Sequence, residues 1–319
     1  MQPIRTCAVS AAHSASTLSC MVVVSGTSWG QQNSAPEASL RNAGRLTAFE
    51  DRSDTKKSEA EAILQLRQLL QEDKKLKPRT DEEFLVRFLR VRKYDVEAAR
   101  KTVQKYYRNR AACPTVYSDF IPSSIDPSSR RIMMVLPSKD ARGRLVILFK
   151  AGVWVPSRKS YDLAQKAALV CLEHMAADPA SQTAGVSILV DSDGFSLNSL
   201  LSCNLSLTRR FFEYLQDCMP MRLKGLHIIH ESKAMDFLFA IMRPFIKRKL
   251  AERIHFHGTD YKNLHEEIPP TMLPEEYGGE AAPLDIEGFW RQMELQDAQF
   301  FENNRFGYPG SQPKRRASR

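Results

Sequence analysis

The stretch MDFLFAIMRPFIKRKLAER, residues 235–253, joins an apolar half to a basic half around Pro244. On helical spacing, Phe237, Ile241 and Phe245 form one of two adjoining rows that make a broad apolar face. Such a helix either covers an apolar interior while its basic end meets an anionic surface, or packs as a core helix with a solvated basic end. The surrounding chain decides between these two interpretations.

Short apolar segments of strand character alternate with helical patterns on either side of this stretch. The segment 186–190 is continuously apolar, as in a strand buried on both faces. Segments 131–136 and 145–149 flank the turn sequence Arg142-Gly143, so they favour a hairpin. The alternation predicts an α/β fold with a mixed, mainly parallel sheet, and right-handed crossovers would place several helices on one side of it. The other predicted strands are 225–229 and 254–257, and the predicted helices are 161–177, 206–219, 261–268 and 286–301.

The region before the sheet has the pattern of a small helical module. A helical stripe starts near Ser58, and Asp81 (or Thr80) and Asp95 stand where two further helices need N-caps. A module of this size is stable only when it docks on something larger. The chain therefore divides into a disordered leader (1–55), the helical module (56–115), an α/β domain (120–283), a C-terminal helix (284–303) and a disordered basic tail (304–319).

Composition narrows the class of protein. The 319 residues carry 46 Lys and Arg against 37 Asp and Glu, a net charge of +9 that favours an anionic partner. No apolar run approaches the ~18–20 residues that span a bilayer, so we expect a soluble or peripheral protein. The six cysteines show no C-x-x-C spacing, which indicates reduced thiols and a cytoplasmic setting. Residues 1–36 lack acids, which fits a disordered leader or, as the alternative, a targeting segment.

The motifs of common catalytic and nucleotide-binding sites are missing from the sequence. There is no G-x-S-x-G elbow and no glycine-rich phosphate loop of either common type, so we expect neither catalysis nor a cofactor. Asp191-Ser-Asp-Gly resembles the start of a calcium loop, but Ser202 stands where that loop needs glutamate, and the acids should instead cap a turn. His255 and His257 share one strand face, yet nothing completes a metal site, so we expect no metal and ordinary packing there.

A basic cluster surrounds the opening stretch. Between Arg222 and Lys262, nine Lys and Arg stand against four acids, which gives a local charge of +5. These groups either converge on a multiply charged phosphate or form a solvated basic face. We expect no nucleic acid as a partner, because neither a recognised motif nor aromatic–basic interleaving accompanies the charge.

Several segments resemble the CRAL-TRIO family in their order and spacing. DEEFLVRFLRVRKYDVEAARKTVQKYYRNR (81–110) is similar to the helical module of that family. The resemblance covers about residues 60–300 and is greatest with the branch that carries tocopherol and retinaldehyde. The segments that resemble the lipid-binding domain of the family are ILVDSDGFS (188–196), MPMRLKGLHIIHES (219–232), MRPFIKRKLAERIHFHG (242–258) and LPEEYGGE (273–280).

The resemblance implies a soluble lipid-transfer protein that is not an enzyme. In this family the sheet floors a deep apolar cavity that a mobile helix closes, and residues 235–253 match this gate helix. The implied partners are a hydrophobic lipid of tocopherol or retinoid type, phosphatidylinositol phosphates, and the surface of endosomal or other intracellular membranes. The cytoplasmic protein would meet these membranes transiently. The implied gate residues are Phe237, Leu238, Ile241, Met242 and Phe245.

The resemblance also implies which residues bind. Ala167 and Cys171 stand where the tocopherol carriers have hydroxyl side chains. The alternative function is a membrane-recruited scaffold that recognises phosphoinositide without transferring lipid. The implied phosphoinositide-binding residues are Arg92, Arg222, Lys224, Arg243, Lys249 and Arg253. The implied lipid-pocket residues are Ala167, Cys171, Val186, Ile188, Val190, Phe211, Tyr214, Leu215, Leu223 and Leu226.

Overall fold

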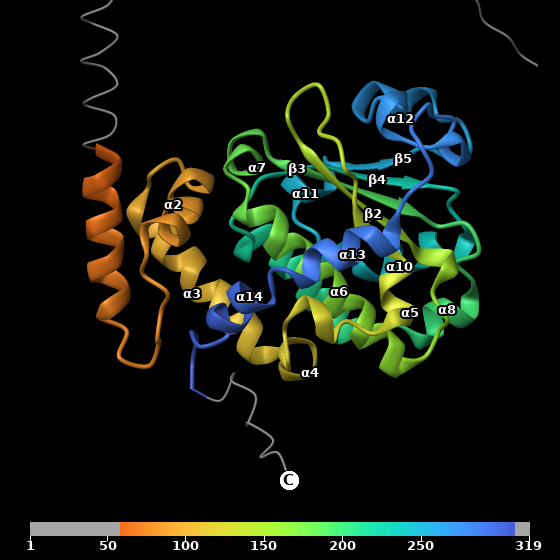
Figure 1. Ribbon diagram of the computed structural model, residues 1–319. Helices are drawn as coiled ribbons and strands as arrows, with labels where there is room; N and C mark the ends of the chain where they lie inside the picture. The colour runs from red at the N-terminus through yellow and green to blue at the C-terminus, as the bar shows by residue number, and fades with distance from the viewer. Residues whose placement is uncertain (1–57, 310–319) are drawn as a thin grey trace, which may run out of the picture. The chain divides into compact units, whose positions relative to one another are not determined.

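The computed structural model describes residues 58–309. The leader expected over 1–55 lies outside this part, as does most of the expected tail. Among the described helices, none combines the length and the apolar character that crossing a bilayer requires. The chain first forms a helical module, which consists of a helix over 58–71, α2 (Glu82–Val91), α3 (Val96–Ala112) and the short α4 (Pro114–Tyr117) (Figure 1).

Local chemistry explains where α2 and α3 begin. The Asp81 carboxylate accepts the N–H of Phe84, and the Asp95 carboxylate accepts that of Ala98, which confirms the predicted caps. Both helices bury aromatic faces against each other, and the Phe88 ring of α2 lies 5.6 Å from the Tyr106 ring of α3. The module therefore has an aromatic core of its own, small as it is.

Hydrogen bonds from side chains to backbone join the helical module to the rest of the chain. Asn109 Nδ2 on α3 donates to the carbonyl of Arg210 at 3.0 Å. Arg222 Nη2 donates to the carbonyl of Arg90, next to the end of α2, at 2.8 Å. The module thus docks on a larger body, as its size requires.

A five-stranded sheet with the order β1-β2-β3-β4-β5 forms the centre of the α/β part. β1 and β2 pair antiparallel and the other pairs are parallel, which confirms the predicted mixed, mainly parallel sheet. In the turn between β1 and β2, the Asp140 carboxylate accepts the N–H groups of Arg142 and Arg144, and Gly143 supplies a φ of 75°. The strands are β1 (Met133–Val135), β2 (Leu145–Lys150), β3 (Val186–Asp191), β4 (Leu223–Ile229) and β5 (Ile254–Phe256).

Helices make each parallel connection of the sheet. The Ser157, Ser196 and Ser232 hydroxyls each accept an N–H from the first turn of such a helix. The connections are α6 (Arg158–Ala177) and α7 (Pro179–Ala184) from β2 to β3; α8 (Leu197–Ser202), α9 (Leu205–Glu213) and a π-helical turn (Tyr214–Cys218) from β3 to β4; and α10 (Lys233–Met242), a 3-10 turn (Arg243–Phe245) and α11 (Arg248–Ala251) from β4 to β5. The remaining elements are α5 (Pro127–Arg130), α12 (Lys262–Glu267), α13 (Ile286–Glu294), α14 (Asp297–Asn303) and 3-10 turns at Pro122–Ser124, Ala151–Val153, Pro270–Met272 and Glu275–Tyr277.

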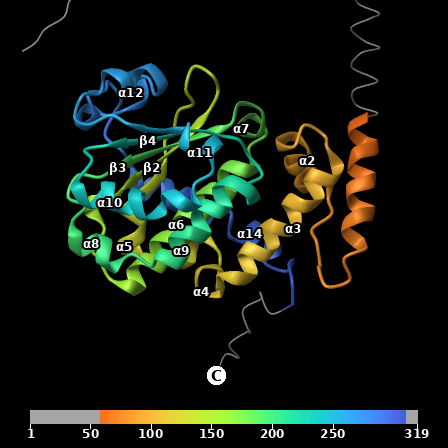
Figure 2. The ribbon, with the colours of Figure 1, turned by 180° about the vertical axis from the view of Figure 1, so that it is seen from behind.

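The two faces of the sheet have different coverings (Figures 1 and 2). Ile147, Ile188 and Leu226 belong to the larger core, which α6, α9 and α10 cover. Leu148 and Leu189 point to the other face, which packs against α12 and the segment after it. Because the parallel strands progress in one direction, their right-handed crossovers put α6, α9 and α10 on the same side, as predicted.

The predicted helix over 235–253 is interrupted, which corrects the expectation from the sequence. α10 ends before Pro244, and Ile246 is extended, with a φ of −94° and a ψ of 114°. Proline has no N–H to donate to the carbonyl one turn earlier, so the helical hydrogen bonds stop there. Lys249 lies in α11 and Arg253 beyond it, so the two cations are not one turn apart on a continuous helix.

The predicted helix over 286–301 is also broken, into α13 and α14. The residues at the break bind other elements. Gln296 Oε1 lies 3.0 Å from His174 Nδ1, and Asp297 Oδ1 accepts the N–H of Ser123 at 3.0 Å. These contacts with distant segments fix a turn where the sequence pattern predicted a continuous helix.

The first residues of the expected tail are part of the fold. Gly307 N–H donates to the Lys77 carbonyl at 2.8 Å, and the Lys77 N–H donates to the Gly307 carbonyl at 3.1 Å. The Tyr308 hydroxyl donates to Asp73 Oδ2 at 3.0 Å. Residues 304–309 are therefore ordered against the helical module, contrary to the expected boundary.

Candidate functional site

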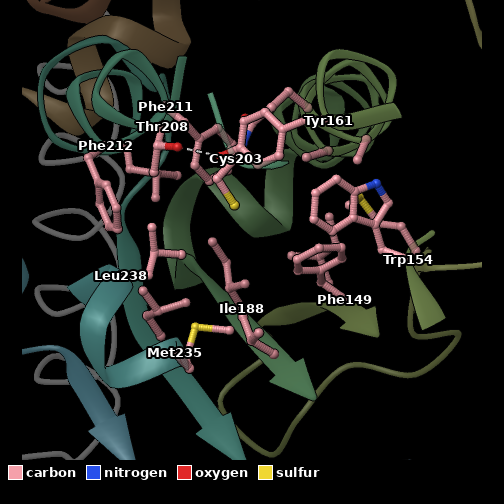
Figure 3. A pocket seen from close by; sticks show the side chains of 18 of the residues that line it. Phe149, Trp154, Tyr161, Ile188, Cys203, Thr208, Phe211, Phe212, Met235 and Leu238 are labelled. Carbon is pink, nitrogen blue, oxygen red and sulfur yellow. Dashed lines mark hydrogen bonds between the residues drawn. The ribbon is translucent and has the colours of Figure 1, made fainter. Parts of the chain in front are cut away.

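A cavity of about 140 Å³ lies between the sheet and the helices that cover its larger-core face. Ile188 of β3 lies on the sheet side, Phe149 and Trp154 line one side, and Met235 and Leu238 line another (Figure 3). Among the described residues that line this cavity, no side chain is charged. The cavity is therefore suited to an apolar molecule rather than to an ion.

Five of the ten predicted pocket residues line this cavity. Alternate residues of a strand share a face, so Ile188 and Val190 both point into it. Val186 begins the same face but pairs with Leu223 at the far end of the sheet. Phe211, Leu215 and Leu226 complete the five, whereas Ala167, Cys171, Val186, Tyr214 and Leu223 are buried outside the lining.

On α6, the residues that line the cavity lie on a different side of the helix from the predicted ones. Ala168 and Leu172 line the cavity, whereas the predicted Ala167 and Cys171 each lie one position earlier and pack elsewhere in the core. With 3.6 residues per turn, one position changes the direction of a side chain by ~100°. The sequence pattern placed α6 correctly but could not fix which of its apolar sides faces the cavity.

α10 forms one wall of the cavity. Met235, Leu238 and Phe239 line it, and Met242 is buried one turn further on. Phe237 points away and is 61% exposed. The residues at i, i+3, i+4 and i+7 from Met235 form the row that faces the cavity. This spacing is the sequence signal by which the two unpredicted lining residues, Met235 and Phe239, could have been found. Of the predicted gate residues, Leu238 and Met242 face inward, whereas Phe237, Ile241 and Phe245 are exposed.

The outward side of α10 continues into an exposed apolar surface. Ile241 lines a surface groove with Leu200, Leu201 and Leu205 from α8 and α9. Large exposed apolar patches are typical of surfaces that contact another protein or a membrane. The α8–α10 apolar surface consists of Leu197, Leu201, Leu205, Phe237 and Ile241, all of which are exposed.

The six predicted cations share one electrostatic property. Within residues 58–309, none of them forms an ion pair with a carboxylate. Their neighbours Lys247 and Arg248 are paired, with Asp217 at 2.5 Å and Glu252 at 2.8 Å respectively. Cations without a counter-charge are free to pair with an external anion. The six are Arg92, Arg222, Lys224, Arg243, Lys249 and Arg253.

Three of these cations come together at the start of β4. Arg253 donates to the carbonyl of Leu223, and Arg222 donates to that of Arg90. Burial lowers the pKa of Lys224, and the neighbouring charges of Arg222 and Arg253 lower it further. An anion bound among the three side chains would offset the repulsion between their positive charges.

The other three cations lie on neighbouring elements. Arg92, at the end of α2, donates to Thr102 Oγ1 at 2.7 Å and to the Asp217 carbonyl at 3.4 Å. Arg243 lines a surface groove between α10 and β5. Lys249 is exposed on α11. Only Arg222, Lys224 and Arg253 are therefore seen to form a cluster.

Three histidines gather where β4 pairs with β5. His227 Nδ1 lies 3.0 Å from His257 Nε2, and the His227 ring stacks on that of His255 with centroids 5.3 Å apart. Burial, and then the two neighbouring rings, lower the pKa of His227 to about 3. In the part of the chain that the structure describes, no three His, Cys, Asp or Glu side chains are arranged to hold a metal ion.

Asp191 caps the end of β3, as the sequence predicts. One carboxylate oxygen accepts the N–H of Asp193 at 3.1 Å and lies 2.8 Å from His230 Nδ1. The other oxygen accepts the Tyr277 hydroxyl at 3.0 Å. This network ties the segment after β5 to the ends of the parallel strands.

Two family models match the chain. Residues 129–279 match the model of the CRAL/TRIO domain, and residues 55–125 match the model described as Pinta-like, UBA domain. The first match contains the sheet and the helices around the cavity, and the second contains the helical module.

Relatives and a solved structure are also similar to this chain. The alpha-tocopherol transfer protein-like protein of Mus musculus is 35% identical over 206 residues, which cover 64% of this chain and 60% of that protein. The match thus spans less than two thirds of that relative. Clavesin-2 of Rattus norvegicus is 31% identical over 222 residues, which cover 68% of this chain and 67% of that protein. The match to the crystal structure of Sfh5 covers 77% of this chain and 98% of the Sfh5 chain, with a TM-score of 0.51. The two sequences are 12% identical, so this is a likeness of fold alone.

Proposed function

The chain belongs to the CRAL/TRIO domain family, and on that premise we propose that it carries a hydrophobic lipid and exchanges it at membranes. The main observation that supports this proposal is the cavity, because its lining is apolar and α10 forms one of its walls. Moving an apolar chain from water into such a lining gains ~0.8 kcal/mol per CH₂ group. At about 140 Å³ the cavity is smaller than the ~300–1,000 Å³ of small-molecule sites, so loading requires its walls to move apart.

We further propose that the lipid is carried without chemical change. Cys203 lines the cavity, but burial raises the pKa of its thiol to about 12. Burial also raises the pKa of the Tyr161 hydroxyl. Neither group ionises near pH 7, and the described lining contains no histidine or carboxylate to activate it.

The α8–α10 apolar surface supports exchange at a membrane. Its leucines and Phe237 face water on the outside of the elements that enclose the cavity. A bilayer would cover these side chains, and an open α10 would expose further apolar groups only where lipid replaces water around them. The membrane is thus the place where opening costs least.

The unpaired cations support recognition of phosphatidylinositol phosphates on intracellular membranes. Each Lys or Arg near an anionic membrane surface contributes ~1 kcal/mol, and a multiply charged headgroup can bridge several of them. The cluster of Arg222, Lys224 and Arg253 already has cations within interaction range of one another. Headgroup binding that is stronger in the open state would shift α10 toward opening.

Identification of the bound lipid tests the proposal. The purified full chain is extracted with organic solvent, and the extract is analysed by mass spectrometry. We expect a hydrophobic lipid in amounts comparable to the protein, with tocopherol- or retinoid-like molecules as the first candidates for reloading. A lipid-free protein that cannot be loaded and yet binds phosphoinositide vesicles would instead support a scaffold.

A further inference from the structure

The loop between β2 and α6 exposes two valines on either side of a buried tryptophan. Val153 and Val155 are 55% and 73% exposed, whereas Trp154 is buried and lines the cavity. The backbone of Trp154 is extended, with a φ of −67° and a ψ of 125°, so its side chain points away from those of its neighbours. One side of this loop therefore belongs to the cavity wall, and the other side faces water.

Contacts with the first turn of α6 hold the loop in this arrangement. Trp154 Nε1 donates to Ser160 Oγ at 2.9 Å, and the Trp154 ring meets the edge of the Tyr161 ring with centroids 5.6 Å apart. The Ser160 hydroxyl donates to the Val155 carbonyl at 2.7 Å. Pro156 follows and restricts Val155 to extended backbone. Because the loop is already fixed, a partner that covers the two valines has little conformational freedom to remove.

The same loop adjoins the segment that leads into α8. A Cβ placed on Gly152 would lie 1.3 Å from the carbonyl oxygen of Asp193, so glycine allows the loop to pack against the backbone after β3. Leu197, the first residue of α8 and part of the α8–α10 apolar surface, stands four residues after Asp193. Figure 3 shows Trp154 and Leu238 of α10 on opposite sides of the cavity. Exposed apolar side chains therefore accompany two walls of the cavity.

We propose that Val153 and Val155 insert into the lipid bilayer as a second membrane contact, beside the one made by α8 and α10. This inference rests on the proposed exchange at membranes and adds a contact at the wall that Trp154 forms. A bilayer fits this loop because the adjoining α8–α10 apolar surface would meet the membrane as well. Lys159, exposed in the first turn of α6, can reach lipid phosphates while the valines enter the acyl region.

Insertion at this loop would act on the cavity itself. Trp154 stands between the two valines in a loop that α6 holds firmly, so a movement of the valines also moves the tryptophan ring in the cavity wall. The cavity of about 140 Å³ must widen to take up a lipid. With contacts on two of its walls, the bilayer stabilises their separation at both sides.

Quenching of tryptophan fluorescence by brominated lipid tests insertion directly. Val155→Trp adds a fluorophore at the proposed contact, Leu201→Trp adds one on α8, and Phe301→Trp adds one on the exposed side of α14. The vesicles contain phosphatidylcholine, phosphatidylserine and phosphatidylinositol bisphosphate, with or without bromine on the phosphatidylcholine acyl chains. We expect the quenched fraction of bound protein to exceed the native value in Val155→Trp and Leu201→Trp, and to equal it in Phe301→Trp.

Replacing both valines by serine measures what the contact contributes to binding. Val153→Ser with Val155→Ser removes side chains that already face water, so the urea unfolding curve should stay close to the native one. The exposed fractions and the gain from burying valine predict that vesicle affinity falls roughly 20- to 100-fold. Leu295→Ser with Phe301→Ser is the matched control and should keep the native affinity.

The outcomes separate this inference from the function on which it rests. Native-like quenching in Val155→Trp, together with increased quenching in Leu201→Trp, would overturn the inference and leave exchange at membranes standing. Unchanged vesicle affinity of the valine double variant would do the same. If neither added tryptophan is quenched while the protein is bound to vesicles, the proposed membrane surface falls together with the inference.

Discussion

Replacing Leu201 and Phe237 by serine should release the protein from membranes without unfolding it. Both side chains belong to the α8–α10 apolar surface, where they are 73% and 61% exposed. Because they already face water, serine removes little packing from the folded state. The free energy of unfolding should therefore change by less than ~1 kcal/mol.

The expected loss of membrane affinity follows from these exposed fractions. Complete burial of a leucine or phenylalanine side chain is worth ~1.5–3 kcal/mol, and the exposed fraction is the part that a bilayer can still cover. The two side chains then contribute together ~2–4 kcal/mol to membrane binding. The double variant should bind vesicles ~30- to 900-fold more weakly.

Vesicle sedimentation measures this loss, and the C-terminal helices supply a matched control. Leu295 lies between α13 and α14, Phe301 lies within α14, and the two are 77% and 58% exposed. α14 is apart from α8 in both views (Figures 1 and 2). Leu295→Ser with Phe301→Ser should leave vesicle affinity unchanged. Equal losses in the two double variants, or no loss in either, would refute the assignment of the membrane contact to α8 and α10.

Three further predictions concern the interior and the charges. Ala168→Phe fills the cavity from α6, so the purified variant should lose its extractable lipid while keeping a native circular dichroism spectrum; unchanged lipid content would place the cargo elsewhere. The pKa of His227 is about 3 in the fold and 6.5 in the unfolded chain, so the unfolded chain binds more protons between these values. The free energy of unfolding should fall as the pH drops through this window, by up to ~1.4 kcal/mol per pH unit, and urea titrations of His227→Gln should show a flatter dependence. Because the pKa of Lys224 is lowered, binding to phosphoinositide vesicles should weaken with rising pH before an ordinary lysine loses its proton, and Lys224→Arg should extend binding to higher pH.

Strand patterns predicted the sheet, and the resemblance to the CRAL-TRIO family implied part of the cavity. The continuous apolar run of β3 predicted its burial on both faces, whereas Ile188 and Val190 were assigned to the cavity by the resemblance alone. The faces of α6 were harder to predict, because apolar residues surround much of that helix and Ala167 and Ala168 are both buried. In such a helix, packing against distant elements selects the lining, and composition alone does not reveal it.

Contacts between distant residues explain what the sequence could not predict. Lys247 and Lys249 look alike in the basic run, yet only Lys247 meets Asp217, thirty residues earlier in the chain. Tyr161 on α6 and Thr208 on α9 likewise meet in the lining of the cavity. Pro244 interrupts the helix that the sequence analysis predicted over 235–253, and the sequence did not show that the chain becomes extended at Ile246.

The rate of lipid transfer between two populations of vesicles tests most directly whether phosphoinositide opens the cavity. We expect phosphatidylinositol bisphosphate in the acceptor vesicles to accelerate transfer by the native chain. Lys224→Gln with Lys249→Gln should abolish this acceleration, whereas Lys247→Gln with Arg248→Gln, which removes two charges that are already paired, should keep it. Transfer by the native chain that is equally fast with and without phosphoinositide would contradict membrane-triggered opening, as would full acceleration in the Lys224 and Lys249 double variant.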